Sequence, residues 1–278
     1  MRRTSTLPLV LLVLACFSAN SLITRYVVSR QLLDPATVTL ARFAAGAGML
    51  ALILGRRGGF GEIWPRRADA LAVAALAGYA LAIAYGYRFI TAAAGTFVFY
   101  ALVVVTMTVG AEARPTWRPL AGALVALAGV GVLAFGKVRG STLLGVGLLA
   151  LTGATWGMYS LVMRRRGAPL VANARAFVGV AALLPVLAWA ERDALVCTAG
   201  GLALGVFMGA VTTALAYALW ARVLPELSPV EAGTLQLLVP VLTASGGVVF
   251  LAEPLTWQLG VSGVLVLAGM WLTVRRGR

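Results

Sequence analysis

The sequence predicts an all-α integral membrane protein, with ten transmembrane helices that form two five-helix repeats of opposite orientation and with both termini in the cytoplasm. The first observation is composition: 61% of the 278 residues are hydrophobic, only 12% are charged, and the mean hydropathy is +0.94. Soluble domains carry about 25% charged residues, so a soluble core does not account for this chain. The second observation is a series of long apolar runs, and the third is an internal repeat.

The apolar runs are each long enough to cross about 30 Å of hydrocarbon as a helix. Helices are required because backbone amides in lipid must be paired within their own segment. The runs also lack the alternation of polar and apolar residues that is typical of barrel strands. Breaks at charged and Pro- or Gly-rich points predict helices at 7–28, 36–55, 69–88, 91–111, 118–136, 142–163, 168–190, 199–221, 229–251 and 256–274.

The first segment has the basic start, apolar stretch and small residues that are also found in signal peptides. Its apolar character continues past Ala19 toward Val28. We therefore expect an uncleaved first membrane helix. The connections that follow, such as GRRGGFGEIWPRR at 55–67, are short, so no large soluble domain is expected.

The net charge of +14 does not indicate a nucleic-acid partner, because the basic residues form short clusters between apolar runs rather than a basic domain. With the N-terminus in the cytoplasm, 15 of the 23 Lys and Arg residues fall in cytoplasmic connections and 6 on the other side. Arginine and lysine accumulate on the cytoplasmic side of membrane proteins. The bias therefore favours a cytoplasmic location for both termini.

The internal repeat relates residues 1–138 to residues 139–278. An offset of 138 places the AGT of 94–96 on the AGT of 232–234. Slightly different offsets place Phe17 on Trp156, Asn20 on Tyr159 and Arg42 on Arg175. Because each repeat holds five spans, the second repeat enters the membrane in the opposite orientation. Inverted repeats are typical of transporters that carry a site near the midplane and open alternately to either side.

Two arginines, Arg42 and Arg175, lie inside predicted spans. Arg42 is about six residues from the end of its span, roughly 9 Å deep at 1.5 Å per residue. A guanidinium does not lose its charge in a protein. Each arginine either reaches its nearer surface or braces helices, or it draws anionic groups toward a cavity and gates it. The sequence leaves both interpretations open.

The last quarter of the chain carries LSPVEA at 227–232, Pro240, LAEPLT at 251–256 and a Gly-rich segment after them. With these features the chain resembles the drug/metabolite transporter superfamily in its ten-helix EamA-type branch. The first half repeats the pattern more loosely, with DPATVTLARF at 34–43 as the start of its second helix.

This resemblance implies a bacterial inner-membrane exporter of small metabolites, with amino acids and their analogues, including aromatic ones, as the leading cargo. Multidrug or organic-cation efflux, and a nucleotide-sugar or lipid-type metabolite carrier, are the alternatives on the same fold.

An amino-acid cargo needs an apolar surface for its side chain, acceptors for its ammonium group and donors for its carboxylate. Aromatic rings provide apolar contact and face cations, and neutral polar groups inside spans usually face a cavity. Pro240 interrupts backbone hydrogen bonding and predicts either a hinge or a simple kink. The predicted binding residues are Phe17, Asn20, Tyr79, Tyr100, Trp156, Tyr159, Tyr217, Gln236, Thr243 and Ser245.

Several absences narrow the function further. The chain has no histidine, two cysteines far apart and nine scattered acidic residues, so we expect no metal site, no cofactor and no enzymatic activity. No Asp or Glu lies near the middle of any predicted span. Proton-coupled carriers usually bury a titratable group, so uniport driven by the cargo gradient is as well supported as proton antiport. The expected partners are a small-molecule cargo and membrane lipid, and the expected state is a monomer.

Overall fold

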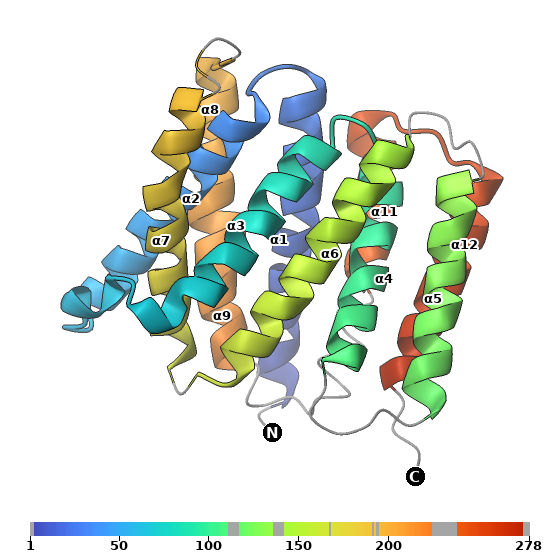
Figure 1. Cartoon of the computed structure of the whole chain (residues 1–278), viewed down its shortest axis with the longest axis horizontal. Coiled ribbons are helices and arrows are strands. Elements are labelled where there is room, and N and C mark those ends of the chain that lie inside the picture. Colours follow the sequence, from blue (N-terminus) through green and yellow to red (C-terminus); the bar gives the residue numbers. More distant parts are fainter. Residues whose placement is uncertain are drawn as a thin grey trace.

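The computed structural model describes residues 3–110, 117–135, 142–166, 168–190, 192, 195–223 and 238–274, and this part of the chain is a helical bundle (Figure 1). The first half contains α1 (Arg3–Ser29), α2 (Pro35–Gly55), α3 (Ala70–Gly86), α4 (Ala92–Val109) and α5 (Trp117–Phe135), with short helices η1 (Phe60–Ile63) and η2 (Arg67–Asp69) between α2 and α3. The second half contains α6 (Leu143–Arg164), α7 (Pro169–Ala190), α8 (Ala199–Phe207), η4 (Met208–Leu215), α9 (Ala216–Val223), α11 (Leu238–Leu251) and α12 (Trp257–Val274).

Each of the ten predicted segments contains a described helix. Two of them differ from a uniform α-helix as the structure describes them. The eighth segment is α8, η4 and α9 in succession, and η4 is a π-helix. In the ninth, the described helix begins at Leu238, and residues 229–237 of the prediction lie outside the described residues.

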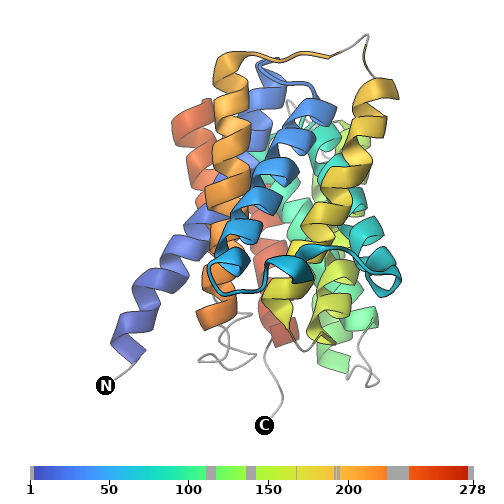
Figure 2. The same cartoon turned by 90° about the vertical axis from the view of Figure 1, so that its left-hand side faces the viewer.

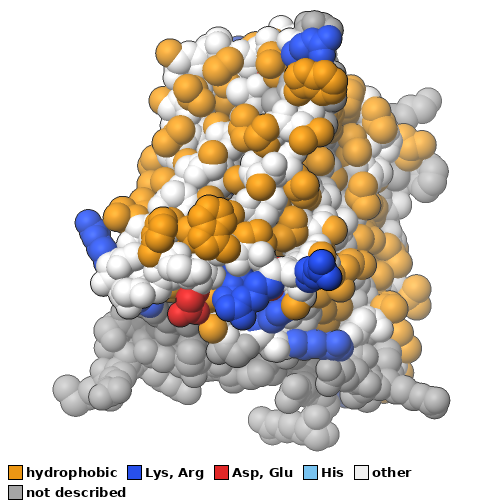
Figure 3. Space-filling view, turned by 60° about the vertical axis from the view of Figure 1, so that its left-hand side comes forward, with side chains coloured by type: hydrophobic (Ala, Val, Ile, Leu, Met, Phe, Trp, Pro, Cys, Tyr) orange, Lys and Arg blue, Asp and Glu red, His pale blue; other side chains and the backbone are white. Residues whose placement is uncertain are grey.

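Length and composition mark five helices as long and apolar enough to cross a membrane, and five shorter apolar helices accompany them within the described residues. Figure 3 shows the matching surface: a broad face of hydrophobic and uncharged side chains, with Lys or Arg at its upper edge and a band of charged side chains toward its lower edge. Side chains of this kind suit a lipid-facing surface. The chain is therefore a multi-pass membrane protein.

The first turn of α1 and the last turn of α12 lie at the same end of the bundle, which we call the terminal end (Figure 1). The opposite end is called the far end. Helices α5 and α12 pack against each other along one edge, and α2 packs against α7 and η4 along the other. Between these edges, α1, α3, α4, α6 and α9 form the middle of the bundle.

Helix starts follow from local side-chain chemistry. Asp34 precedes α2, its side chain accepts a hydrogen bond from the Thr37 amide, and Pro35 takes the first helical position. Thr91 caps α4 and Thr198 caps α8 in the same manner. Such residues accept hydrogen bonds from amides that a helix start leaves unpaired, and proline fits the first position because its missing N–H is not needed there.

Hydrogen bonds connect the loops at the far end. The Asp34 amide donates to the Val196 carbonyl, and the Val196 amide donates to a carboxylate oxygen of Asp34, both at 3.0 Å. Leu33 and Cys197 form an isolated antiparallel bridge next to this pair. The α1–α2 loop and the α7–α8 loop are therefore held together. We call these contacts the loop clamp.

The terminal end carries a second set of contacts, where the loop with η1 and η2 runs across α7 (Figure 2). Arg166 forms an ion pair with the buried Asp69 at 3.4 Å. The Arg175 Nε–H donates to the Glu62 carbonyl at 2.8 Å. A surface pocket of about 310 Å³ lies among these side chains and Arg66.

Candidate functional site

The candidate site is centred on Arg42, which lies about two turns after the start of α2 at Pro35. Its side chain is almost fully buried, with 2% of the residue exposed. The Nε–H donates to the Thr213 hydroxyl at 3.2 Å, and an Nη2–H donates to the Tyr79 hydroxyl at 2.9 Å. The guanidinium carbon lies 5.2 Å from the ring centre of Tyr79 and 5.4 Å from that of Phe43. Arg42 therefore braces α2 against α3 and η4 and does not reach a surface.

A chain of hydrogen bonds continues from Arg42 to α1. The Thr213 hydroxyl donates to the Asn20 side-chain oxygen at 3.0 Å, and the Thr212 hydroxyl donates to the same oxygen at 2.8 Å. The Asn20 amide group donates to the Thr212 carbonyl at 2.8 Å. Asn20, Arg42, Thr212 and Thr213 are all buried. We call this set, together with Tyr79, the polar relay.

The π-helix η4 brings two adjacent threonines to this relay. Single π-turns occur frequently at functional sites, and here Thr212 and Thr213 both bond to Asn20. Gly209, in the first turn of η4, permits the approach. A Cβ at Gly209 would lie 2.1 Å from the Arg42 carbonyl oxygen, so only glycine allows η4 to pack this closely on α2.

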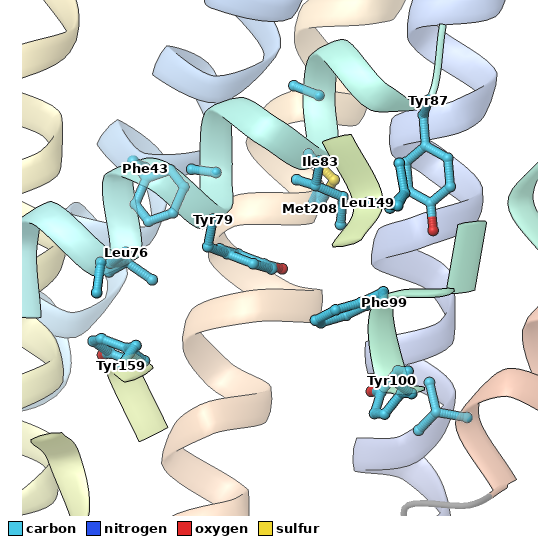
Figure 4. Packing of buried hydrophobic residues seen from close by; sticks show 14 of the residues in the cluster. Phe43, Leu76, Tyr79, Ile83, Tyr87, Phe99, Tyr100, Leu149, Tyr159 and Met208 are labelled. Atoms are coloured by element: carbon cyan, nitrogen blue, oxygen red, sulfur yellow. The ribbon is translucent and has the colours of Figure 1, made fainter. Parts of the chain in front are cut away.

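An aromatic cluster adjoins the polar relay and begins at Tyr79. The Tyr79 ring lies 4.9 Å from Trp156 and 5.9 Å from Phe99, between ring centres. In Figure 4 the Tyr79 ring lies below Phe43 and above Tyr159 and Phe99. The cluster consists of Phe99 and six predicted residues, and each ring lies within 6 Å of another member. The six predicted residues are Phe17, Tyr79, Tyr100, Trp156, Tyr159 and Tyr217.

The cluster is built from both halves of the chain, and its members differ in burial. Trp156 and Tyr217 are in ring contact at 5.7 Å, as are Phe17 and Tyr217. Tyr159 is buried and donates to the Asn173 side chain at 2.5 Å, whereas Phe17, Trp156 and Tyr217 are half-buried. An apolar group could therefore contact the cluster along its half-buried members.

Three other predicted binding residues lie elsewhere or outside the described residues. Thr243 is buried and donates to the Ser18 hydroxyl at 3.1 Å where α11 meets α1. Ser245 lines an apolar groove of about 390 Å³ between these two helices. Gln236 lies outside the described residues. Pro240 is buried in the first turn of the described part of α11, and its predicted role as a hinge stays a prediction.

Arg175 does not share the environment of Arg42. It is half-buried, lines the surface pocket at the terminal end and bonds to a loop carbonyl there. The offset that aligns the two arginines thus relates positions with different surroundings. Arg175 is placed where it contacts the α2–α3 loop, and its predicted gating role stays a prediction.

Sequence reasoning missed four contributors to the site. Phe43 and Phe177 are fully buried and lie 4.8 Å apart between ring centres, and Phe177 also contacts Tyr217 at 5.9 Å. Nothing distinguishes these two phenylalanines from lipid-facing ones in the sequence. The other two are Thr212 and Thr213, because their side-chain partners are 192 and 171 residues away in the chain.

Glu253 is a further residue whose position the sequence did not reveal. Both carboxylate oxygens accept from the Ala92 amide, at 2.8 and 2.9 Å, at the start of α4. The Arg25 Nε–H donates to the same carboxylate at 3.4 Å, and an Arg25 Nη1–H donates to the Tyr87 carbonyl at 2.6 Å. We call these contacts the Glu253 latch. Its signal in the sequence was the acidic residue of the LAEPLT motif.

Taken together, the helices and the buried site define a multi-pass membrane protein with a polar and aromatic centre between its two halves. Residues 143–275, which fall in the second predicted repeat, match the model of the EamA-like transporter family. The chain belongs to this family, and it is therefore a membrane transporter of small metabolites.

Two relatives and one solved structure are similar to this chain over most of its length. Over 98% of its length the chain is 34% identical to an uncharacterized protein of Pseudomonas aeruginosa, of which it covers 96%. It is 26% identical to an uncharacterized transporter of Archaeoglobus fulgidus, with 89% of this chain and 91% of the relative covered. One solved structure, titled as the crystal structure of a protein, has a TM-score of 0.70 with 96% of this chain and 95% of that chain covered. The TM-score shows a shared fold, and at 20% sequence identity the similarity shows the fold alone.

Proposed function

We propose that the protein exports small metabolites, foremost amino acids including aromatic ones, across the bacterial inner membrane by alternating access. Both termini lie in the cytoplasm in this proposal, and residues 1–138 and 139–278 are the two repeats. The observation that carries it is the site itself. The polar relay and the aromatic cluster are buried between helices and draw side chains from α1, α2 and α3 on one side and from α6, η4 and α9 on the other.

Support for an inverted repeat comes from the pattern of helix contacts. If α1 corresponds to α6 and α4 to α11, an approximate two-fold axis requires the α4–α6 contact to have a counterpart between α11 and α1. Both contacts are present. The α3–α6 contact likewise has its counterpart between α1 and the η4–α9 segment. In the α5–α12 and α2–α7 contacts, each helix packs against the helix that corresponds to it in the other half. Such symmetry is typical of carriers whose halves exchange conformations.

Support for alternating access comes from the two ends of the bundle. The far end is held by the loop clamp and by the Glu253 latch, both of which connect segments of the two halves. The terminal end has the Arg166–Asp69 ion pair and the Arg175–Glu62 contact. Opening the far end to release cargo requires the clamp and the latch to separate. These contacts are few and local, so they suit a reversible gate.

Support for uniport comes from the places of the carboxylates. The described residues contain four of them, and all lie at an end of the bundle. Asp34 and Glu253 belong to the far-end contacts, whereas Glu62 and Asp69 line the pocket at the terminal end. None of these four forms an ion pair with Arg42. A buried titratable group is the usual means of proton coupling, so cargo moves down its own gradient in this proposal.

The test is a counterflow screen with the purified protein in proteoliposomes. Vesicles are preloaded with one unlabelled compound, and uptake of labelled amino acids, nucleosides and organic cations is measured with and without a pH gradient. The proposal predicts saturable amino-acid exchange that does not require the gradient. Exchange of organic cations alone would contradict the cargo assignment, and an absolute requirement for the gradient would contradict uniport. Protein-free vesicles control for leakage.

A further inference from the structure

We propose that the cargo is a small organic carboxylate, that its carboxylate group binds the Arg42 guanidinium, and that its apolar body lies against the aromatic cluster. This inference rests on the proposed function, because it names the class of cargo that the same site accepts. It excludes organic cations that lack a carboxylate. The argument uses the charge balance at Arg42, the way in which its donors are held, and the apolar surroundings.

The charge of Arg42 is not balanced by any carboxylate of the described residues. Arginine stays protonated, and burying a charge without a partner is costly. Two other arginines are partly buried, and each has a carboxylate that balances its charge. Arg25 pairs with Glu253, and Arg166 pairs with Asp69. Arg42 is more deeply buried than either of them, yet its hydrogen-bond partners in the described part of the chain are two hydroxyl groups, and two aromatic rings lie close to its guanidinium. An anionic cargo would supply the missing charge.

Two donors of Arg42 hold the guanidinium in place, and the other three make no hydrogen bond within the described residues. A guanidinium carries five N–H groups in a fixed plane, and two of them donate to Thr213 and Tyr79. Both acceptors are neutral, so they fix the orientation of the guanidinium without cancelling its charge. Thr213 is in turn held by Asn20. The free edge of a guanidinium binds a carboxylate through two parallel hydrogen bonds, which are the strong, charge-assisted kind.

The apolar part of the site begins where the polar part ends, because Tyr79 belongs to both. Its hydroxyl accepts from Arg42, and its ring lies 4.9 Å from Trp156. Trp156, Tyr217 and Phe17 are half-buried and continue the series of ring contacts that begins at Tyr79. A compound with a carboxylate at one end and an aromatic or branched apolar body matches this arrangement. An organic cation would instead be repelled by Arg42.

The first experiment measures binding to the wild-type protein in nanodiscs by calorimetry, independently of transport. Four probes share one aromatic body: 3-phenylpropionate, phenylalanine, phenylalaninamide and phenethylamine. We expect the two carboxylates to bind about tenfold or more tightly than the amide and the amine, because only they place a negative charge against the Arg42 guanidinium. Equal or tighter binding of phenethylamine, or no binding of either carboxylate, overturns the inference.

The second experiment uses variants and compares 3-phenylpropionate with a fifth probe, its neutral amide. Arg42→Gln removes the charge and is expected to abolish the preference for 3-phenylpropionate over its neutral amide, 3-phenylpropionamide. Arg42→Lys keeps a charge but not the planar fork and is expected to keep part of the preference. Arg30→Gln is the matched control, because Arg30 is exposed at the end of α1, and it leaves the preference unchanged. An undiminished preference in folded Arg42→Gln protein overturns the inference.

The two assays separate this inference from the proposed function. Carboxylate-selective binding without counterflow of any probe supports Arg42 as the anchor and contradicts transport by this mechanism. Counterflow of amines and amides at the same rates as carboxylates supports a transporter and overturns the assignment of Arg42. If Arg42→Gln does not fold, the wild-type probe series and Arg42→Lys still decide the question.

Discussion

Replacing Gly209 by alanine tests whether the close crossing of η4 and α2 positions the polar relay. A Cβ at this position would lie 2.1 Å from the Arg42 carbonyl oxygen and 2.8 Å from its carbonyl carbon. Both neighbours are backbone atoms and cannot rotate away as a side chain can. Ordinary contact begins at 3.4 Å, so the two helices would have to separate by about 1.3 Å.

That separation has a local and a global consequence. The Arg42–Thr213 hydrogen bond is already 3.2 Å long, and an added displacement of this size takes it beyond hydrogen-bond distance. Overpacking of this kind costs about 1–3 kcal/mol. Because a buried guanidinium would also lose an acceptor, we place the expected loss of unfolding free energy at the upper end of that range.

The assay is thermal unfolding of the purified protein in detergent, together with calorimetric binding of 3-phenylpropionate. Gly209→Ala is expected to lower the melting temperature by several degrees and to weaken binding. Gly48→Ala is the matched control, since it adds the same methyl group to α2 at a place where nothing lies within 4 Å. Equal melting temperatures and equal affinities for the two variants would refute the role assigned to the crossing.

Three further predictions concern the relay and the far end. Glu253→Gln removes the ion pair with Arg25 and is expected to lower the free energy of unfolding by about 1.5–3 kcal/mol. In a double-mutant cycle measured by thermal unfolding, Arg25→Gln should add little to this loss. Fully additive losses would count against the latch. Asp34→Ala removes the α2 cap and the acceptor for Val196, at about 0.5–2 kcal/mol. Hydrogen exchange at the Thr37 and Val196 amides should rise together, and a rise at Thr37 alone would mean that the loop clamp does not depend on Asp34. Asn20→Leu leaves Thr213 without its acceptor and should weaken 3-phenylpropionate binding more than Asn173→Leu does, since the Asn173 side chain bonds to Tyr159 and to a carbonyl of its own helix and not to Arg42 or Thr213. The reverse order would contradict the relay.

The helices were predictable because the membrane imposes a simple condition on sequence. Apolar runs define spans, and their starts carry residues such as Asp34 and Thr91 whose side chains cap the first turn. The π-helix η4 was not predictable by this reasoning. Its residues are as apolar as those of an α-helix. The π-helix is stabilised by contacts between Thr212 and Asn20, which are 192 residues apart, and hydropathy gives no information about such contacts.

The candidate site was predictable in its residue types and only partly in its arrangement. Polar and aromatic residues inside spans are costly unless they face other helices. This argument selected Asn20, Tyr79 and Trp156, which the structure brings into one region, and their role in binding stays a prediction. The environment of Arg42 depends on which helices meet. Pairings such as that of α2 with η4 lie far apart in sequence, and no local pattern encodes them.

The position of Cys197 gives the loop clamp an experimental use. This cysteine is exposed and lies in the bridge with Leu33, whereas Cys16 is half-buried within α1. These are the two thiols of the chain, so Cys16→Ser leaves a single native labelling site at the far end. An environment-sensitive dye attached there would report separation of the two loops during turnover, without any engineered cysteine.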